Sequence, residues 1–301
     1  MPGTNTVNIP ASIRNVYAQE IIREATPRLM FSQFAKKKQD LRQNAGGAVK
    51  FTKYASIARG GKLTEGVNMN EKALSNSEVT ITVEEYGNAV VVSEKALQLS
   101  IHDELAEASV ALANDMAIVL DETIRDVALL TTNQVYGGEK AAAGDLVEGD
   151  GLTTGAIKDA VEALANNNTP KIAGRYYICI ATPHQLRQLR DDDNWVNAHS
   201  YVNVGDVYAG EVGMYEGVRF IETTQMPANS AAESTEKYGI AIKTWEAVIF
   251  GENSIGWAEA LPVEMRDDGV TDYGRKHGIA WYAIWGFGII EEQNIFSILT
   301  A

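Results

Sequence analysis

Histidine is the side chain best suited to move a proton or to bind a transition metal near neutral pH. The chain has four, His102, His184, His199 and His277. None of them has a second His, Cys or carboxylate at the spacing of a common metal motif. We therefore expect each histidine at a helix end or on the surface, and the sequence predicts no metal site.

Motifs for phosphate binding and nucleophilic catalysis are incomplete. Gly60-Gly61-Lys62 ends like a phosphate loop, but Ser56 stands where the first glycine belongs and Leu63 follows the lysine. Gly286-Phe287-Gly288 lacks the third glycine and the following helix of a dinucleotide site. No G-x-S-x-G sequence is present, and the single cysteine, Cys179, lies in an apolar run that predicts a small buried hydrophobe. We therefore predict that the chain is not an enzyme and that it uses no cofactor.

Three acidic clusters remain as candidate sites. Residues 144–151, Gly-Asp-Leu-Val-Glu-Gly-Asp-Gly, offer oxygen ligands for calcium, but their spacing is wrong for an EF-hand and favours a solvated loop. Asp191-Asp192-Asp193 ends a predicted helix, either in solvent or facing a basic segment of a partner. A third group mixes both signs, which usually marks a solvated turn but can set the register between subunits. Its members are Asp267, Asp268, Asp272, Arg275 and Lys276.

The composition fits one elaborate globular domain or two closely joined ones, with 301 residues, 45% of them hydrophobic and 22% charged. One cysteine cannot form an intrachain disulfide, so nothing requires an oxidising compartment. The first residues lack the basic and apolar regions of a signal peptide. The most aromatic run, residues 281–290, is too short to span a bilayer, and we expect no membrane association.

Charge is divided unevenly along the chain. Residues 1–62 contain eleven Lys or Arg against three acids, a net charge of +8, whereas the remainder carries −22, which together give −14. Nucleic-acid phosphate repels so acidic a body, which argues against sequence-specific DNA or RNA binding. The basic segment either folds onto its own acidic body or reaches the acidic bodies of neighbouring copies. Both interpretations fit the charge pattern.

The first third of the chain predicts an arm and a projecting loop. Residues 1–47 are expected to be extended, with short helices at 16–28 and 29–34. A polar span, residues 56–77, is long for a simple strand connection and is typical of a functional loop. Period-two alternation predicts strands around it, at residues 49–52, 79–84 and 89–92.

A long helix is the main feature that follows. After a short helix at 94–99, capped by Ser93, apolar residues at three- and four-residue steps predict one helix from Ile101 to about Asn133. At 1.5 Å per residue it would span about 50 Å. The remaining predicted elements are helices at 155–166 and 184–190, and strands at 176–181, 218–222, 238–243, 263–266, 279–290 and 295–299. The fold class is therefore α+β.

This order of elements resembles the tailed-bacteriophage capsid fold of the Hong Kong 97 type. Short stretches spread over nearly the whole chain carry the resemblance, among them Lys62-Leu63-Thr64-Glu65-Gly66, which is similar to the Leu-x-Glu-Gly of that family's loop. The other stretches are residues 46–54, 83–87, 92–97, 182–186, 217–222, 272–275 and 286–288.

The resemblance implies a domain organisation. It places an N-terminal arm at 1–47, an extended β-hairpin loop (E-loop) at 48–92 and a peripheral domain with the spine helix at 93–149. An axial domain at 150–258 and C-terminal strands at 259–301 that complete the peripheral domain would follow. With about 47 residues before the loop, we expect no room for the scaffolding domain that some members carry, and so a separate scaffolding protein.

The resemblance also implies a function, that of a major capsid protein which self-assembles into the icosahedral shell around double-stranded phage DNA. Expected partners are other copies of the chain in hexamers and pentamers, the scaffolding protein, a portal protein and, in some phages, a decoration protein. Packaged DNA would be contacted non-specifically. The expected location is the virion capsid, after assembly in the host cytoplasm.

In that fold the arm and the loop lie across neighbouring subunits, and here they carry the positive charge. We therefore predict ion pairs between the basic segment and acids of other chains. The predicted intersubunit contact residues are Lys36, Lys37, Lys38, Arg59, Lys62, Glu65, Asp191, Asp192, Asp193, Asp267, Asp268 and Arg275. Two alternatives stay open: an encapsulin-like compartment shell, and an acidic α/β enzyme with an unrecognised site.

Overall fold

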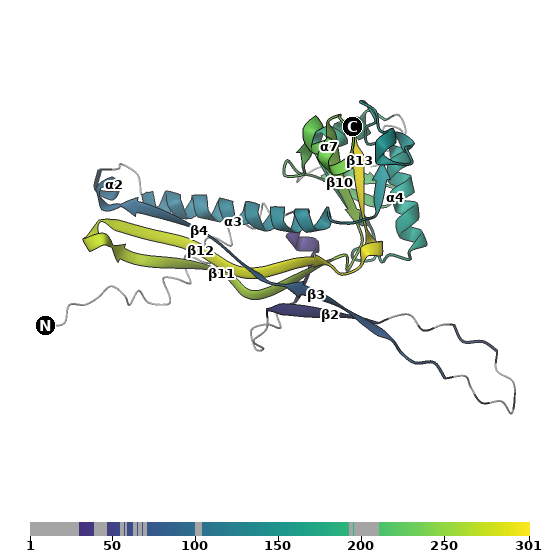
Figure 1. Cartoon of the computed structure of the whole chain (residues 1–301), viewed down its shortest axis with the longest axis horizontal. Helices are drawn as coiled ribbons and strands as arrows, with labels where there is room; N and C mark the ends of the chain where they lie inside the picture. Colours follow the sequence, from purple (N-terminus) through teal and green to yellow (C-terminus); the bar gives the residue numbers. More distant parts are fainter. Residues whose placement is uncertain are drawn as a thin grey trace.

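The computed structural model of the chain describes residues 30–38, 47–54, 57, 59–62, 65, 68, 71–99, 104–192, 195 and 211–301. They form an elongated body of sheets and helices from which a β-hairpin projects (Figure 1). The helix expected at 16–28 lies outside the described residues.

A four-stranded sheet runs along the body in the order β1-β11-β12-β4 (Figure 1). The long hairpin β11–β12 forms its centre, and β4 pairs antiparallel with β12 from Glu84 opposite Trp285 to Ser93 opposite Lys276. The short β1 pairs parallel with the start of β11. The strands of this sheet are β1 Lys36–Lys38, β4 Glu84–Ser93, β11 Ile255–Thr271 and β12 Lys276–Ile289.

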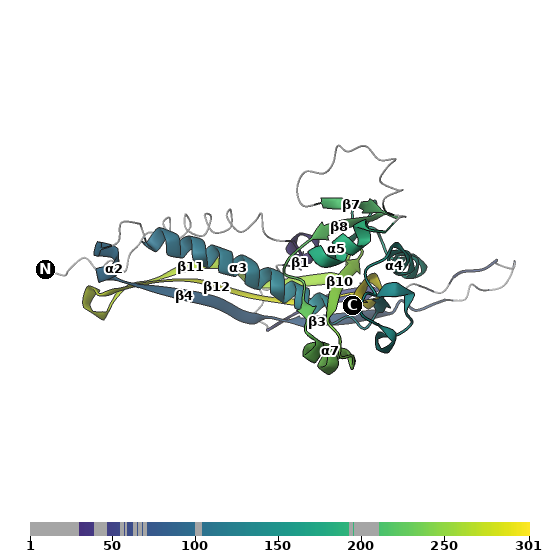
Figure 2. The same cartoon turned by 90° about the horizontal axis from the view of Figure 1, so that it is seen from above.

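One helix, α3 Glu104–Ala128, lies along one face of this sheet (Figure 2). Its apolar stripe, including Leu112, Met116 and Ile124, is buried in one core with the tryptophans of β12, Trp281 and Trp285. A short helix, α2 Glu94–Leu99, joins β4 to the segment before α3, as the sequence predicted.

The long helix ends five residues earlier than expected, at Ala128 rather than Asn133. Polar side chains explain the difference, since Ser, Thr and Asn readily replace helical hydrogen bonds with bonds to other backbone and side-chain groups. Thr131 donates its hydroxyl to Glu292 Oε1 at 2.8 Å, and Asn133 Nδ2 donates to the backbone oxygen of Glu292 at 2.6 Å. The chain is thereby held to the segment before β13.

A seven-stranded sheet forms the other end of the body, in the order β5-β13-β10-β6-β8-β7 with β9 beside β10. Helices α4 and α5 pack on it around a second core that contains Ile157, Leu186 and Phe220. Its strands are β5 Gln134–Tyr136, β6 Tyr177–Ala181, β7 Glu211–Tyr215, β8 Val218–Glu222, β9 Ala228–Asn229, β10 Thr244–Phe250 and β13 Ile295–Thr300. The helices are α4 Thr154–Asn166, α5 Pro183–Arg190 and α7 Ala231–Tyr238. Five 3-10 turns complete the described elements: η2 Ser32–Phe34, η4 Gly137–Glu139, η5 Ala143–Asp145, η7 Asp272–Gly274 and η8 Glu292–Asn294.

The two sheets share one hydrophobic core. Ile180 of β6 and Phe250 of β10 belong to the same buried cluster as Ile124 of α3 and Trp285 of β12. The two parts of the body are therefore joined by apolar packing and not only by the chain.

Two sequence predictions in this region were wrong. Residues 238–243 form no strand, because Ser230 and Glu233 make a capping box that starts α7 and Gly239 ends it with a left-handed φ of 75°. The fully buried β13 belongs to the seven-stranded sheet between β5 and β10, so residues 259–301 do not complete a single sheet. Its mostly apolar sequence, buried at every position, is typical of a central strand that is covered on both faces.

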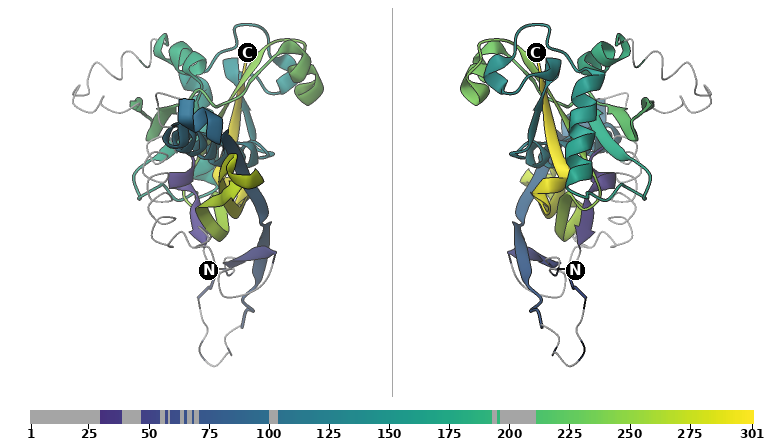
Figure 3. Two further views of the ribbon diagram at one scale, coloured as in Figure 1. Left: turned by 90° about the vertical axis from the view of Figure 1, so that its left-hand side faces the viewer. Right: turned by 90° about the vertical axis from the view of Figure 1, so that its right-hand side faces the viewer.

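The projecting hairpin consists of β2 Ala48–Tyr54 and β3 Asn76–Thr82, paired antiparallel from Ala48 opposite Thr82 to Tyr54 opposite Asn76. The strand expected at 79–84 divides at Val83 between β3 and β4. End-on views place the C-terminus in the upper part of the molecule and the β2–β3 hairpin in the lower part (Figure 3). The hairpin therefore extends away from the seven-stranded sheet.

Candidate functional site

The basic residues predicted as contacts fall into two groups, and the first, on β1, faces its own chain. Lys37 Nζ lies 2.6 Å from Glu259 Oε2, a carboxylate only 4% exposed, and 4.2 Å from the ring centre of Trp257. Lys36 Nζ donates to Asn253 Oδ1 at 2.9 Å, and Lys38 Nζ donates to a backbone oxygen of β2 at 3.0 Å. For Lys37, the ion pair that was predicted with another chain is made within this chain.

A buried carboxylate holds the chain just before β1. Asp121 Oδ1 accepts the backbone N–H groups of Met30 at 3.0 Å and Phe31 at 2.9 Å, and the Phe31 side chain is wholly buried. Asp121 Oδ2 has no hydrogen-bond partner within the part of the chain that the structure describes. Burial raises the pKa of Asp121, whereas the two N–H groups and the charge of Arg125 act to lower it. Sequence reasoning missed this residue, although an acid inside the apolar stripe of α3 was a usable signal.

The second group of basic residues lies on the connection between β2 and β3. Arg59, Lys62 and Glu65 are exposed, and none of them forms an ion pair among the described residues. Large apolar side chains are exposed on the same hairpin, with Tyr54 at 65% and Leu74 at 60%. Both the charge and the apolar area of this connection are therefore available to another molecule.

The aspartates at the end of α5 differ in their contacts. Asp192 Oδ2 accepts from Thr154 N at 3.0 Å and from Thr154 Oγ1 at 2.8 Å, and so binds the first turn of α4. Asp191 is exposed at the C-cap of α5, and Asp193 lies outside the described residues. Asp192 thus joins two helices of its own chain, which the sequence did not predict.

The mixed-charge turn caps the far end of the β11–β12 hairpin. Asp267 Oδ1 accepts from Gly269 N at 2.7 Å, and the Asp268 side chain lies beside Gly278 of β12. Asp272 lies 3.8 Å from Arg275 and 3.6 Å from Lys276. Tyr273, which follows Asp272, is fully exposed. Both residues have a left-handed backbone, with a φ of 52° at Asp272 and 54° at Tyr273. Such strain in residues other than glycine is often found at functional positions.

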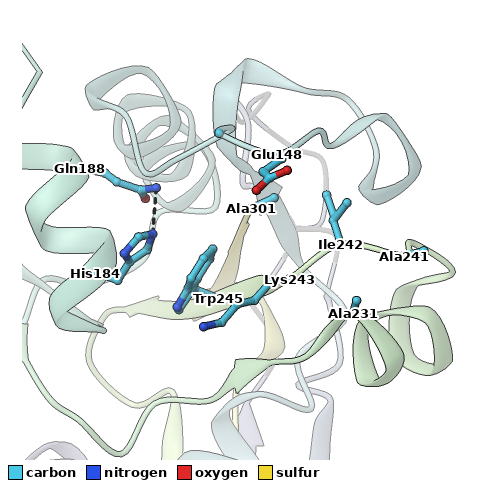
Figure 4. Close-up of a pocket in the computed structure, with 10 residues that line it drawn as sticks. Glu148, His184, Gln188, Ala231, Ala241, Ile242, Lys243, Trp245 and Ala301 are labelled. Atoms are coloured by element: carbon cyan, nitrogen blue, oxygen red, sulfur yellow. Dashed lines mark hydrogen bonds between the residues drawn. The ribbon is translucent and has the colours of Figure 1, made fainter.

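A cavity of about 520 Å³ lies between α5 and β10, near Ala301 (Figure 4). The His184 ring stacks on Trp245 with 4.0 Å between ring centres, and Gln188 Nε2 lies 3.2 Å from His184 Nε2. Burial, together with the nearby charges of Lys243 and Arg187, lowers the pKa of His184. Glu148 and Lys243 also line it, so the cavity carries charged groups of both signs beside the Trp245 ring.

Other reactive groups are structural in the described part of the chain. Cys179 is fully buried as predicted, and burial raises the pKa of its thiol to about 12. His277 Nε2 lies 2.8 Å from Glu94 Oε2, a pair that joins β12 to α2. Among the described residues no three His, Cys, Asp or Glu side chains are grouped to hold a metal ion. No described helix is long and apolar enough to cross a bilayer.

Comparisons with known proteins match this arrangement. The family described as phage capsid protein matches residues 77–298. The capsid of Ralstonia phage GP4 superposes with a TM-score of 0.71 at 17% identity, over 89% of this chain and 87% of that one. The cyanophage Pam1 capsid gives 0.72 at 16% over 92% of each chain, and that of Helicobacter pylori bacteriophage KHP30 gives 0.66 at 15% over 88% and 87%. At these identities the likeness is one of fold, and no curated protein sequence matches significantly.

Proposed function

Because the chain belongs to the phage capsid protein family, we propose that it is the major capsid protein whose copies close into an icosahedral shell around the double-stranded DNA of a tailed phage. A capsid protein is structural material, and we assign it no catalytic role. The family match does not favour the alternative of a cellular compartment shell.

The fold supports a more detailed assignment, to the Hong Kong 97 type. In these terms the residues up to 47 form the arm, the hairpin from 48 forms the E-loop, and α3 is the spine helix. The four-stranded sheet corresponds to the peripheral domain, and the seven-stranded sheet to the axial domain. Because β13 lies in the second sheet, the axial domain includes the C-terminus as well as most of residues 150–258.

One observation supports the assembly role above the others: the connection between β2 and β3 extends beyond the body with its charges and apolar side chains exposed. We propose that Arg59 and Lys62 pair with acids of a neighbouring copy, and that apolar burial at Tyr54 and Leu74 supplies most of the adhesion. Suitable acids are exposed on β4 and α3, namely Glu84, Glu85 and Glu107.

The other predicted contacts divide in the same way. Asp191, Asp268 and Glu65 remain proposed intersubunit residues. Lys37 and Asp192 are left out, because Lys37 pairs with the nearly buried Glu259 and Asp192 binds the first turn of α4. Asp267 and Arg275 are secondary candidates, because each also has a contact within this chain. Lys36 and Lys38 are secondary candidates, since their side chains also have contacts within this chain.

The remaining partners rest on the family resemblance. We propose a separate scaffolding protein and a portal protein; a decoration protein, which some phages of this fold carry, is a further candidate. The packaged DNA would be contacted without sequence preference, since the chain carries a net charge of −14. The proposed location is the virion capsid, after assembly in the host cytoplasm.

Expression of the full chain, with and without its scaffolding protein, followed by size-exclusion chromatography and negative-stain microscopy, tests this function. We expect closed shells. Reversal of the hairpin charges with Arg59→Glu and Lys62→Glu should reduce the yield of shells, and raising the ionic strength should reduce the wild-type yield. Arg175→Glu, at an exposed position in the segment before β6, is the matched control. A uniformly monomeric wild-type protein under every condition contradicts the proposal.

A further inference from the structure

The root of the hairpin crosses the long sheet over three glycines. Gly256 of β11 and Gly288 of β12 are register partners, and Gly286 lies two residues before Gly288 on the same strand. Ile81 and Thr82 of β3 pass directly over them. We refer to Gly256, Gly286 and Gly288 as the glycine slot.

The slot has no room for any larger residue. A Cβ on Gly288 would lie 2.9 Å from Ile81 Cγ1, and one on Gly256 would lie 2.8 Å from Ile81 Cδ1. A Cβ on Gly286 would overlap the backbone oxygen of Thr82 and lie 2.9 Å from its carbonyl carbon. Real Cβ atoms do not approach so closely, so something must shift at each position. At Gly286 the obstacle is the backbone of β3, whereas at Gly288 it is the Ile81 side chain, and at Gly256 it is the side chains of Ile81 and Ile290.

Space, and not backbone conformation, explains these glycines. None of the three has a positive φ, so an alanine could adopt the same backbone. Because glycine has no side chain, two backbone segments can approach closely here, which is one of the recognised uses of glycine within strands.

Further contacts hold the root against the body. Ile81 is 3% exposed and packs with Val49, Phe51 and Ala258 in a separate small core. Val83 N donates to the backbone oxygen of Gly47 at 3.1 Å, and Lys53 forms an ion pair with Glu291 in the segment that follows β12. The root is thus continuous with the sheet, whereas the described residues between Tyr54 and Asn76 are exposed.

We propose that the glycine slot sets the angle at which the hairpin leaves the subunit, and thereby the curvature of the shell. The inference rests on the proposed function, since a hairpin that reaches a neighbouring copy fixes the tilt between the two. Gly286 and Gly288 act as positioning residues through Thr82 and Ile81.

Substitutions at the slot test the proposal. Gly288→Ala should lift Ile81 and change or abolish shells of wild-type diameter, measured by gradient sedimentation and microscopy. Ile81→Ala removes the obstructing atoms, because Ile81 Cβ lies 3.9 Å from the new methyl position, an ordinary contact. The double variant should therefore form more wild-type-diameter shells than Gly288→Ala alone. Gly286→Ala should gain nothing from Ile81→Ala, because its obstacle is backbone.

Two further measurements separate positioning from general loss of stability. Gly144→Ala, where an added Cβ meets nothing within 4 Å, is the control and should assemble normally. Spin labels at Glu71→Cys and Val110→Cys, in shells diluted with unlabelled copies, report the direction of the hairpin, and buried Cys179 stays unlabelled. Gly288→Ala should shift the distance between the two labels, and the added substitution Ile81→Ala should restore it.

The results distinguish the two proposals. Wild-type-diameter shells with an unshifted distance in Gly288→Ala overturn the role of the slot, as does a double variant no better than Gly288→Ala. A wild-type chain that forms no shells overturns the proposed function itself.

Discussion

Asp121 of α3 accepts the backbone N–H of Phe31 at 2.9 Å, in the interior of the protein and across 90 residues of sequence. The same oxygen accepts the N–H of Met30, so one carboxylate satisfies a buried and a partly buried backbone donor at the point where the described chain begins. Backbone N–H groups without an acceptor are costly in an apolar interior. The position of the arm on the long helix therefore depends on Asp121.

Substitution of Asp121 by alanine should loosen this attachment. It leaves the N–H groups of Met30 and Phe31 without their acceptor, and we expect the free energy of unfolding to fall by about 2 kcal/mol or more. Urea unfolding of dissociated subunits measures the loss, and faster proteolysis near Met30 should accompany it. An unchanged unfolding midpoint would contradict the anchoring role.

The same residue predicts a pH dependence. Because burial raises the pKa of Asp121 above the ordinary carboxyl value, the folded chain binds this proton more tightly than the unfolded chain. Its contribution to stability is fully present below the unfolded pKa, near 3.9, and is lost as pH rises through the raised folded pKa. Arg125 opposes the shift, and Glu122 adds to it.

Asp121→Asn cannot titrate and should remove this dependence. The unfolding free energy of the Asn variant minus that of the wild type should grow from acid to neutral pH. Taking a difference cancels the opposite behaviour of carboxylates with lowered pKa, such as Glu94 and Glu233. A difference that stays constant with pH would show that Asp121 does not titrate as inferred.

Two adjacent lysines of β1 should behave differently. Lys37→Glu places two carboxylates together at the nearly buried Glu259, and we expect a loss of about 3 kcal/mol in subunit stability. Lys36→Glu, on an exposed hydrogen bond to Asn253, should cost no more than about 0.5 kcal/mol. Thermal unfolding of both variants tests the difference, and equal losses would mean that β1 is not held through Lys37.

The acidic run after α5 provides a second matched pair. Asp192→Ala removes the acceptor at the first turn of α4 and should cost about 1 kcal/mol, the usual value of a helix cap. Asp191→Ala, at an exposed position, should change stability by less than about 0.5 kcal/mol. If Asp191 is an intersubunit residue, its variant lowers shell yield while the unfolding curve stays unchanged, the reverse of what Asp192→Ala should show.

Local patterns in the sequence predicted many elements well. The strand Val218–Glu222 and the helix Glu94–Leu99 were predicted with the bounds that the structure has. Alternation and capping act over a few residues, so they can be recognised without knowledge of the fold. The strand β10 was missed because nearly every residue of Thr244–Phe250 is buried, and burial on both faces removes the alternation of apolar and polar residues.

The site was harder to predict, because its contacts join residues far apart in the chain. The exposure of Arg59 and Lys62 followed from the polar, glycine-containing span around them. The pairing of Lys37 with Glu259 could not be predicted, since it depends on β1 lying parallel to β11. Asp192 binding to Thr154 likewise depends on how α4 and α5 pack.

The core that Phe250 and Trp285 share has a mechanical consequence. Because one buried apolar cluster includes residues of both sheets, the body should behave as one rigid unit and unfold in a single cooperative step. A closed shell needs subunits that meet at more than one angle. Any conformational change that accommodates those angles must then occur at the edge of each subunit, in the projecting hairpin and the exposed turns, and not in its centre.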